Sequence, residues 1–397
     1  MKLKESPFAS EKDRPRVFVA RGDDPYSTAR AALAGIDLAP AGGKRVLLKP
    51  NAGRVAAPGS GVTTDPRVVA AAIDAFSEAG ATVAVGESPI TGIKTPEALE
   101  ASGIARVARE RNCPLIDMDA GKPVDVELPE GRAINSIKVC PEVFEYDIVV
   151  SIPVMKIHMH TGVTLAVKNM KGCLWRRSKV QLHMLPAVEG RQGRSLDVAI
   201  ADMSGALRPH LAVIDGTVGM EGLGPSAGRP KPLGVVVAGI DAFAADAVAC
   251  GLMGQKAGSI PHLRIGAERG YGTLDLDRIL VSPENWRDFG DTFEPAPENL
   301  SIEFPDVNIL DKQSCSACQS TLLLFLQRNG DELREYFPPG ERINIAIGKG
   351  HSELPEGTLC IGNCTSCHRD RGIFVAGCPP VGSNILKAVR GEGRPAE

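Results

Sequence analysis

The chain has 397 residues, of which 43% are apolar, 23% charged and 4% aromatic. Because a single hydrophobic core rarely grows beyond about 250–300 residues, we expect one large domain and a smaller one. The net charge of −3 and the scarcity of aromatic rings argue against a nucleic-acid partner, since the chain offers neither a basic field nor many stacking platforms.

The first residues, from Met1 to Arg16, are polar and charged and lack the apolar core of a secretory signal. Elsewhere in the sequence no uncharged apolar run approaches the ~20 residues that cross a bilayer. We therefore expect a cytoplasmic protein without a membrane partner. Thiols stay reduced in that compartment, so the ten cysteines are candidates for metal ligands, reactive thiols or buried apolar residues before disulfides.

Short apolar runs alternate with helical patterns over the first three-quarters of the chain. The expected strands are 17–20, 46–48, 82–85, 114–118, 148–154, 212–214 and 233–238, and the expected helices include 27–33, 65–76 and 242–252. Strands that are apolar throughout and separated by helices predict an α/β fold, with a largely parallel sheet covered by helices on both faces.

The composition changes near residue 285. Asn285 to Asn299 is polar and proline-containing, which is typical of a linker or long loop. Six of the ten cysteines follow it. We therefore predict an α/β domain over 1–285 and a smaller, cysteine-rich α/β domain that binds iron and sulfur over 300–397.

Polar residues follow several of the predicted strands. In sheets of this kind ligands bind beyond the carboxyl ends of the strands. We expect the following residues to lie there: Lys49, Asn51, Glu87, Lys156, His158 and Asp215. Lys49 and Asn51 are among the residues that we predict to bind substrate.

The densest polar motif covers 155–172 and contains two histidines, three lysines and two threonines. Lys and His just past a strand can hold a carboxylate or phosphate and can transfer protons. We predict catalytic roles for Lys156, His158 and Lys168 and a substrate-binding role for Thr164. Lys171 is expected on a solvated face.

A glycine-rich segment, 215–225, follows another strand and is predicted to be a flexible loop that brings amides against an anion. It matches neither the Walker A motif nor the dinucleotide fingerprint. Asp215 and Glu221 are predicted to bind substrate, although Asp215 could equally satisfy turn amides. Asp241 is expected to cap the next helix, and Asp246, inside that helix, is expected to pair with Lys49 or Lys168.

The C-terminal cysteines form a Cys-x-x-Cys pair, a Cys-x₃-Cys-x₂-Cys-His run and a Gly-Cys-Pro-Pro segment. They are Cys315, Cys318, Cys360, Cys364, Cys367 and Cys378. Four thiolates suffice for a [4Fe–4S] cluster, with a lone Cys before Pro often supplying the last, and this is the preferred interpretation. A structural zinc site is the alternative, and a c-type haem is disfavoured because its attachment requires export.

These motifs together resemble the DUF362 family of uncharacterised, often iron–sulfur-associated proteins. The matching segments lie at 49–51, 147–158, 163–172, 215–225 and 239–246. Many relatives carry an inserted ferredoxin, whereas this chain ends in the cysteine set described above. Resemblance to relatives with that ending implies that the cluster ligands are Cys315, Cys318, Cys364 and Cys378, with Cys360 and Cys367 as alternates.

The resemblance implies an association with redox chemistry but supplies no reaction. We predict an iron–sulfur oxidoreductase that reduces or transforms a small anionic substrate. A non-catalytic electron-transfer or cluster-delivery protein and a zinc-stabilised binding protein are the alternatives. A redox partner such as a ferredoxin or flavodoxin is expected, and the sequence leaves a homo-oligomer open.

Overall fold

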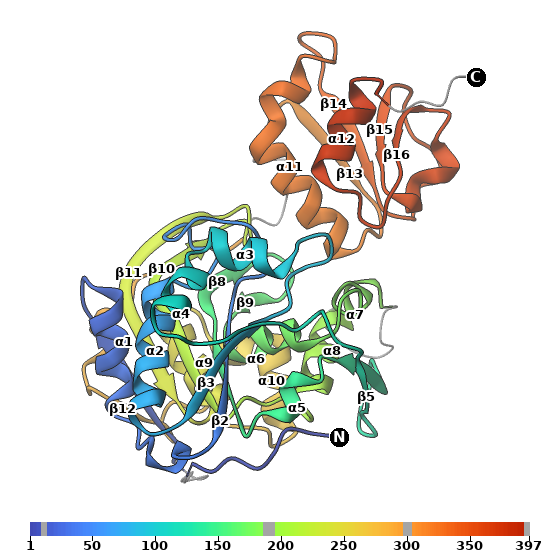
Figure 1. Cartoon of the computed structure of the whole chain (residues 1–397). Helices are drawn as coiled ribbons and strands as arrows, with labels where there is room; N and C mark the ends of the chain where they lie inside the picture. Colours follow the sequence, from blue (N-terminus) through green and yellow to red (C-terminus); the bar gives the residue numbers. More distant parts are fainter. Residues whose placement is uncertain (9–13, 186–194, 297–303, 393–397) are drawn as a thin grey trace. The chain divides into compact units, whose positions relative to one another are not determined.

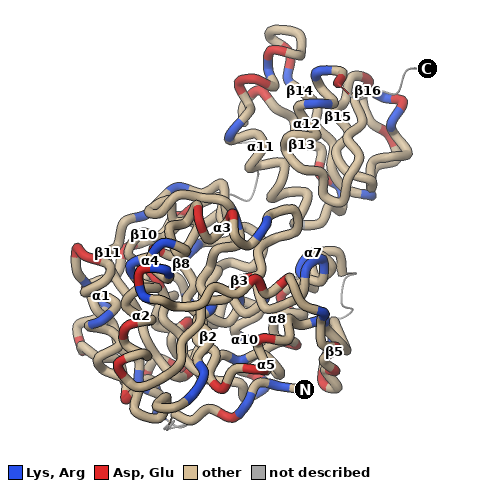
Figure 2. The backbone as a smooth tube through the Cα atoms, viewed as in Figure 1, with Lys and Arg blue, Asp and Glu red and all other residues tan. Residues whose placement is uncertain are grey.

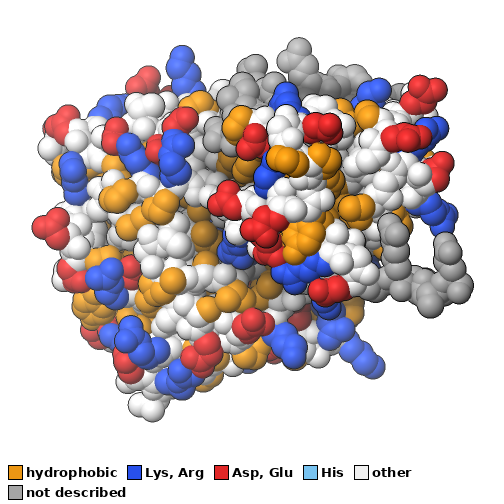
Figure 3. All heavy atoms as spheres, turned by 90° about the horizontal axis from the view of Figure 1, so that it is seen from above, with side chains coloured by type: hydrophobic (Ala, Val, Ile, Leu, Met, Phe, Trp, Pro, Cys, Tyr) orange, Lys and Arg blue, Asp and Glu red, His pale blue; other side chains and the backbone are white. Residues whose placement is uncertain are grey.

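The computed structural model of the chain describes residues 1–8, 14–185, 195–296 and 304–392. The chain divides into two compact units, Met1–Pro295 and Ala296–Glu397 (Figure 1). Basic and acidic positions are interspersed along both units (Figure 2), and the face in Figure 3 carries both signs among apolar side chains. This mixture agrees with the near-neutral net charge.

A ten-stranded sheet forms the centre of the described part of the large unit, in the order β12-β1-β11-β10-β7-β2-β3-β4, with β8 paired to β10 and β9 paired to β8. Its strands are β1 Arg16–Arg21, β2 Arg45–Pro50, β3 Thr82–Glu87, β4 Leu115–Asp117, β7 Ile148–Ile152, β8 Val154–His158, β9 Gly162–Thr164, β10 Leu211–Glu221, β11 Arg229–Gly239 and β12 Leu280–Ser282. Most pairs are parallel, whereas β11 runs antiparallel to β1 and β10, and β9 runs antiparallel to β8. The expected α/β class is confirmed.

Helices pack on the two faces of this sheet (Figure 1). Those of the large unit are α1 Pro25–Leu33, α2 Pro66–Glu78, α3 Thr95–Ala101, α4 Ile104–Glu110, α5 Glu142–Glu145, α6 Ala166–Asn169, α7 Ser178–Gln181, α8 Ser195–Ser204, α9 Ala242–Leu252 and α10 Pro261–Glu268. Asp65 and Asp241 cap α2 and α9 through their carboxylates, and the cap at Asp241 was expected from the sequence. A separate hairpin consists of β5 Val124–Glu127 and β6 Ser136–Val139.

Two expected loops are strands. Lys156 and His158 lie within β8, which pairs with β9 and β10, rather than beyond a strand end. The segment that begins at Asp215 continues β10 as far as Glu221, with an irregularity in pairing between Gly216 and Val218. The prediction of a flexible glycine loop was wrong there, because a long partner strand, β11, satisfies the backbone of the glycine-rich residues.

The large unit extends past the expected boundary at residue 285. Trp286 and Phe293 are both buried, so residues predicted to be a linker contribute to its core. The rest of the predicted linker, from 297 onward, lies outside the described residues.

The small unit is built on a parallel four-stranded sheet in the order β13-β14-β15-β16. Its elements are β13 Val307–Asp311, α11 Ser316–Arg334, β14 Ile343–Ile347, β15 Thr358–Ile361, the 3₁₀ helix η7 Asn363–His368, β16 Gly372–Val375 and α12 Gly382–Val389. Leu322, Phe325 and Ile385 from the two α-helices bury against the strands in one core. No helix among the described residues is long and apolar enough to cross a membrane.

Candidate functional site

The cysteines of the small unit lie mainly where strands of the parallel sheet end. Cys315 follows β13 and occupies the N-cap position of α11, with Cys318 one turn into that helix. Cys364 follows β15, and Cys378 follows β16. Since the strands are parallel, their carboxyl ends share one edge of the sheet, which is where such folds bind ligands.

Two of these loops are fastened to each other. The backbone N–H of Asn363 donates to the carbonyl of Gly377 at 2.9 Å, and the N–H of Gly377 donates to Asn363 Oδ1 at 2.8 Å. Gly362 has a φ of +91°, and a Cβ added there would lie 3.5 Å from Cys318 Sγ. The glycine therefore permits a close approach of this backbone to the thiol.

Electrostatic interactions separate four of the six thiols from the other two. A hydrogen bond from Cys318, assisted by amides at the start of α11, lowers the pKa of Cys315 to about 6. The same interaction, with burial, raises the pKa of Cys318, and Cys364 and Cys378 raise it further. Burial raises the pKa of Cys364, and Cys378 and Cys315 add to that effect. These four thiols are therefore neighbours.

Cys360 and Cys367 have a different environment. Cys360 is buried within β15, and its thiol donates to the carbonyl of His368 at 3.6 Å. Its raised pKa results from burial and then from Asp370 and Cys367. Among the residues that the structure describes, no three His, Cys, Asp or Glu side chains are arranged to hold a single metal ion.

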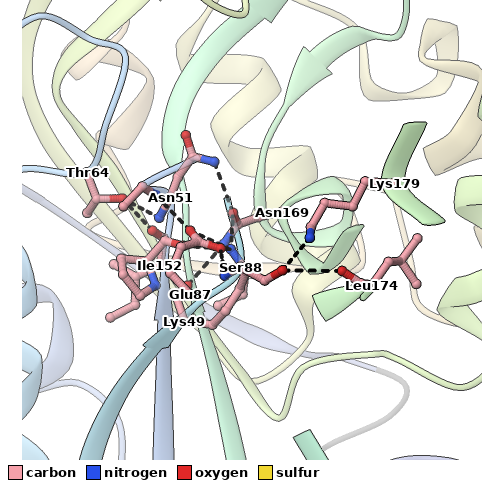
Figure 4. Close-up of polar contacts among 12 residues, drawn as sticks. Lys49, Asn51, Thr64, Glu87, Ser88, Ile152, Asn169, Leu174 and Lys179 are labelled. Carbon is pink, nitrogen blue, oxygen red and sulfur yellow. Dashed lines mark hydrogen bonds and ion pairs between the residues drawn. The ribbon is translucent and has the colours of Figure 1, made fainter. Parts of the chain in front are cut away.

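In the large unit, Lys49 at the end of β2 forms a fully buried ion pair with Glu87 at the end of β3, at 2.9 Å (Figure 4). Lys49 Nζ also donates to the carbonyl of Pro50 and to Asn169 Oδ1. Glu87 accepts the amides of Ala52 at 2.7 Å and of its own neighbour Ser88 at 2.8 Å. Lys49 was predicted to bind substrate, but its ammonium group is already neutralised and enclosed.

Asn51 connects this network to Lys156. Its side-chain amide donates to Asn169 Oδ1 at 3.2 Å, and its Oδ1 accepts from Lys156 Nζ at 2.8 Å. Lys156 Nζ also contacts the carbonyls of Val62 and Pro225. Lys156 is thus a buried lysine whose hydrogen-bond partners are neutral oxygens.

The three predicted catalytic residues lie together. Burial lowers the pKa of Lys156 and of His158 well below their usual ranges, and in each case Lys168 is the strongest of the neighbouring charges. Burial also lowers the pKa of Lys168 to about 7. Lys171, expected on a solvated face, is half-buried against His183, and burial lowers its pKa as well. This group of basic side chains is named the cation cluster; its members are the buried Lys156, His158 and Lys168 and the half-buried Lys171.

Two further predicted substrate ligands are held by backbone amides. Asp215 is buried and accepts the N–H groups of Asp65 and Thr217, which matches the alternative role of satisfying turn amides. Glu221 accepts the N–H of Glu294 at 3.0 Å and lies 3.7 Å from Arg229. Both carboxylates therefore fix loops and strands.

The expected ion pair between Asp246 and Lys49 or Lys168 was wrong. The Asp246 carboxylate accepts the amides of Ala166 and Val167, at 2.7 and 3.0 Å, where α6 begins. Lys168 instead donates to Thr164 Oγ1 at 3.0 Å. Thr164, predicted to bind substrate, therefore holds the side chain of Lys168. Asp246 thus holds the helix that carries Lys168.

Several residues of this region were not singled out as site residues from the sequence. Asn169 donates to the carbonyl of Lys49 and to Ser151 Oγ, both at 3.1 Å. Asp197 and His262, 65 positions apart, form a buried pair at 3.3 Å. The sequence signal for Asn169 is its place in the dense polar motif, whereas nothing local links Asp197 to His262.

Comparison with known proteins gives a family. Residues 46–251, just over half of the chain, match the family described as "Domain of unknown function (DUF362)". The "Thylakoid-associated protein sll1697" of Synechocystis sp. is 30% identical over 252 residues, which are 62% of this chain and 76% of that protein. Among solved structures, the lactate racemase apoprotein from Thermoanaerobacterium thermosaccharolyticum matches with a TM-score of 0.40 and 14% identity, over 65% of this chain and 62% of that one.

Proposed function

The chain belongs to the DUF362 family, and within it we propose that this member is an iron–sulfur oxidoreductase acting on a small anionic substrate. In this proposal the small unit holds a [4Fe–4S] cluster through Cys315, Cys318, Cys364 and Cys378. The large unit binds the substrate at the cation cluster.

The observation that carries the cluster proposal is the convergence of four thiols from three loops at one edge of a parallel sheet. The residues fit such a group in two further respects. Cys315 is poised as a thiolate, the form that binds iron. Gly362 leaves the backbone beside Cys318 without a side chain. The cluster, when bound, would supply one-electron chemistry, and the thiolates would set its position.

The anionic character of the substrate follows from buried basic side chains that lack an acidic partner within the described part of the chain. Glu87, the acidic group that raises the pKa of Lys156, is already paired with Lys49. A buried cation without a counter-ion is costly, so burial lowers the pKa values of these lysines, and a carboxylate or phosphate would favour their charged forms by supplying negative charge. Lys156 and Lys168 would orient such a ligand, and His158 would exchange a proton with it.

A matched pair of variants tests the cluster ligands. Cys364 and Cys367 are both exposed and lie on the same 3₁₀ helix. Of the two, only Cys364 affects the pKa of Cys318, one of the other three proposed ligands. Protein purified without oxygen should be brown, contain about four irons per chain and give a low-temperature EPR signal on reduction. Cys364→Ser should lose most of the iron, whereas Cys367→Ser should keep it.

Equal iron retention in the two variants would contradict the ligand assignment. Colourless protein with stoichiometric zinc would contradict the redox function and support a zinc-stabilised binding protein instead.

A second candidate function is electron transfer or cluster delivery without a substrate reaction. The exposure of Cys364 favours it, because a cluster at the surface can reach a partner such as a ferredoxin or flavodoxin. Cluster transfer to an apoprotein that is unchanged in a Lys156→Met variant would support this candidate. The relative's name refers to thylakoids, and a cytoplasmic location for this chain stays a prediction.

A further inference from the structure

Lys168 differs from the other buried lysines in what its ammonium group contacts. Lys49 has the carboxylate of Glu87, and Lys179 has Asp119 at 3.6 Å and the hydroxyl of Ser88. Lys156 has three oxygen acceptors. Within the described residues, Lys168 Nζ has one hydrogen-bond acceptor, the hydroxyl of Thr164.

A lysine in this setting is held in the form that reacts with carbonyl groups. Burial removes the hydration that favours the ammonium ion, and burial is the main reason that the pKa of Lys168 is about 7. An ordinary surface lysine, with a pKa near 10.4, carries roughly a thousandfold less free amine at neutral pH. Desolvation of this kind is one way in which enzymes activate a nucleophilic lysine.

A proton-exchanging pair lies near the same amine. Asp197 on α8 contacts His262 Nδ1 on α10, and both side chains are buried. His262 Nε2 is buried and has no hydrogen-bond partner among the described residues. Asp197 is the one charge that raises the pKa of Lys168, and Lys168 in turn lowers the pKa of His262, so the pair lies within electrostatic range of this amine. An oriented imidazole with an open nitrogen is the arrangement expected of an acid–base group.

We propose that Lys168 forms an imine with small anionic carbonyl compounds, such as 2-oxo acids, and that His262 moves the protons. The amine nitrogen attacks the carbonyl carbon, and a C–N bond forms as the carbonyl oxygen takes up a proton. The carbinolamine then loses its hydroxyl as water, with His262 carrying a proton from nitrogen to the departing oxygen. One amine and one carbonyl thus give one imine and one water, without any oxidant or reductant.

The choice of an anionic carbonyl compound rests on the proposed function, because the cation cluster supplies the partner for the acid group. Lys156 is the proposed partner of the acid group, since after burial Lys168 is the strongest influence on its pKa, and a bound carboxylate would favour its charged form. In a 2-oxo acid the carboxylate adjoins the carbonyl carbon. In the proposed complex the carbonyl carbon meets Lys168 and the adjoining carboxylate meets Lys156.

Reductive trapping tests the inference on the full-length wild-type protein. The protein is incubated with glyoxylate and cyanoborohydride at pH 7, and the modified lysines are located by peptide mass spectrometry. Hydride from the reagent reduces the imine carbon and leaves a carboxymethyl group on nitrogen. Lys168 should be modified at least about tenfold faster than the exposed Lys4, because of its larger fraction of free amine.

Lys179 is the matched control, since it is equally buried but faces a carboxylate, and it should stay unmodified. His262→Gln should slow the modification of Lys168 at saturating glyoxylate without shifting the glyoxylate concentration that gives half the maximal rate. Modification confined to exposed lysines, or a Lys168 no faster than Lys4, overturns the proposal.

Oxalate separates this outcome from failure of the proposed function, because it is a dianion that forms no imine with lysine under these conditions. Suppose that oxalate raises the unfolding temperature of the wild type but not of Lys156→Met, and that glyoxylate leaves Lys168 unmodified. The anion site then stands and the imine is refuted. If glyoxylate labels Lys168 and the protein nonetheless lacks a cluster, the imine stands and the oxidoreductase proposal fails.

Discussion

Replacing Lys49 with Met would test whether the Lys49–Glu87 pair is structural. Both side chains are 1% exposed, and their charged atoms are 2.9 Å apart. In the variant Glu87 keeps the amides of Ala52 and Ser88 but loses its only ion-pair partner among the described residues. The acceptors Pro50 O and Asn169 Oδ1 also lose their donor. A stranded buried charge typically costs about 3–5 kcal/mol, and the two remaining amide bonds place this case near the lower end.

Urea unfolding followed by tryptophan fluorescence measures this cost in the large unit alone, because Trp175 and Trp286 are the chain's two tryptophans and both belong to that unit. With a slope of about 3 kcal/mol per M, a cost of about 3 kcal/mol lowers the urea midpoint by about 1 M.

Lys4→Met is the matched control, since it removes the same group from an exposed pair with Asp147 and should cost about 0–1 kcal/mol. Equal shifts in the two variants would refute the argument that burial makes the Lys49–Glu87 pair essential.

The remaining predictions concern neighbouring residues. Gly172→Ala would place a Cβ 2.6 Å from Lys49 Nζ and should destabilise the large unit by about 1–3 kcal/mol, whereas Gly258→Ala, which meets nothing within 4 Å, should leave the urea midpoint unchanged. Burial raises the pKa of Asp246 from 3.8 to about 8, so between these values the folded protein holds a proton that the unfolded chain has released. Stability should therefore fall as the pH rises through this window, and Asp246→Asn should flatten that part of the profile of urea midpoint against pH; an unchanged slope would contradict the assignment.

Much of the fold could be predicted because its elements carry local signals. The helix α9 begins at its Asp241 cap and covers the predicted residues, since its Ala-rich pattern and cap agree. The extension of β10 through a glycine-rich segment could not be predicted, because its stability depends on pairing with β11, whose residues lie further along the chain. Long-range pairing of this kind overrides the local preference of glycine for turns.

The site divides in the same way. Lys156, His158 and Lys168 could be found because they crowd one short motif next to a buried strand, and the structure brings them together. The partners of the buried charged groups could not be predicted. Lys49 pairs with a residue of a different strand, and the carboxylate of Asp246 accepts backbone amides rather than facing a cation. No local signal links the amides at the start of α6 to an acidic residue 80 positions away.

The distribution of buried charge explains why the large unit would need an anion. Lys49 is neutralised by Glu87, and this pair, with its hydrogen bonds to neighbouring groups, fixes the ends of β2 and β3. Lys156 and Lys168 are held beside it by neutral oxygens, so their positive charge is suppressed by lowered pKa values rather than cancelled by carboxylates. A ligand that brings negative charge would raise those pKa values and take up protons as it binds. Proton uptake on adding oxalate, measured by calorimetry in two buffers of different ionisation enthalpy, is therefore the signature expected of this cluster, and binding without uptake would show that the lysines are already charged.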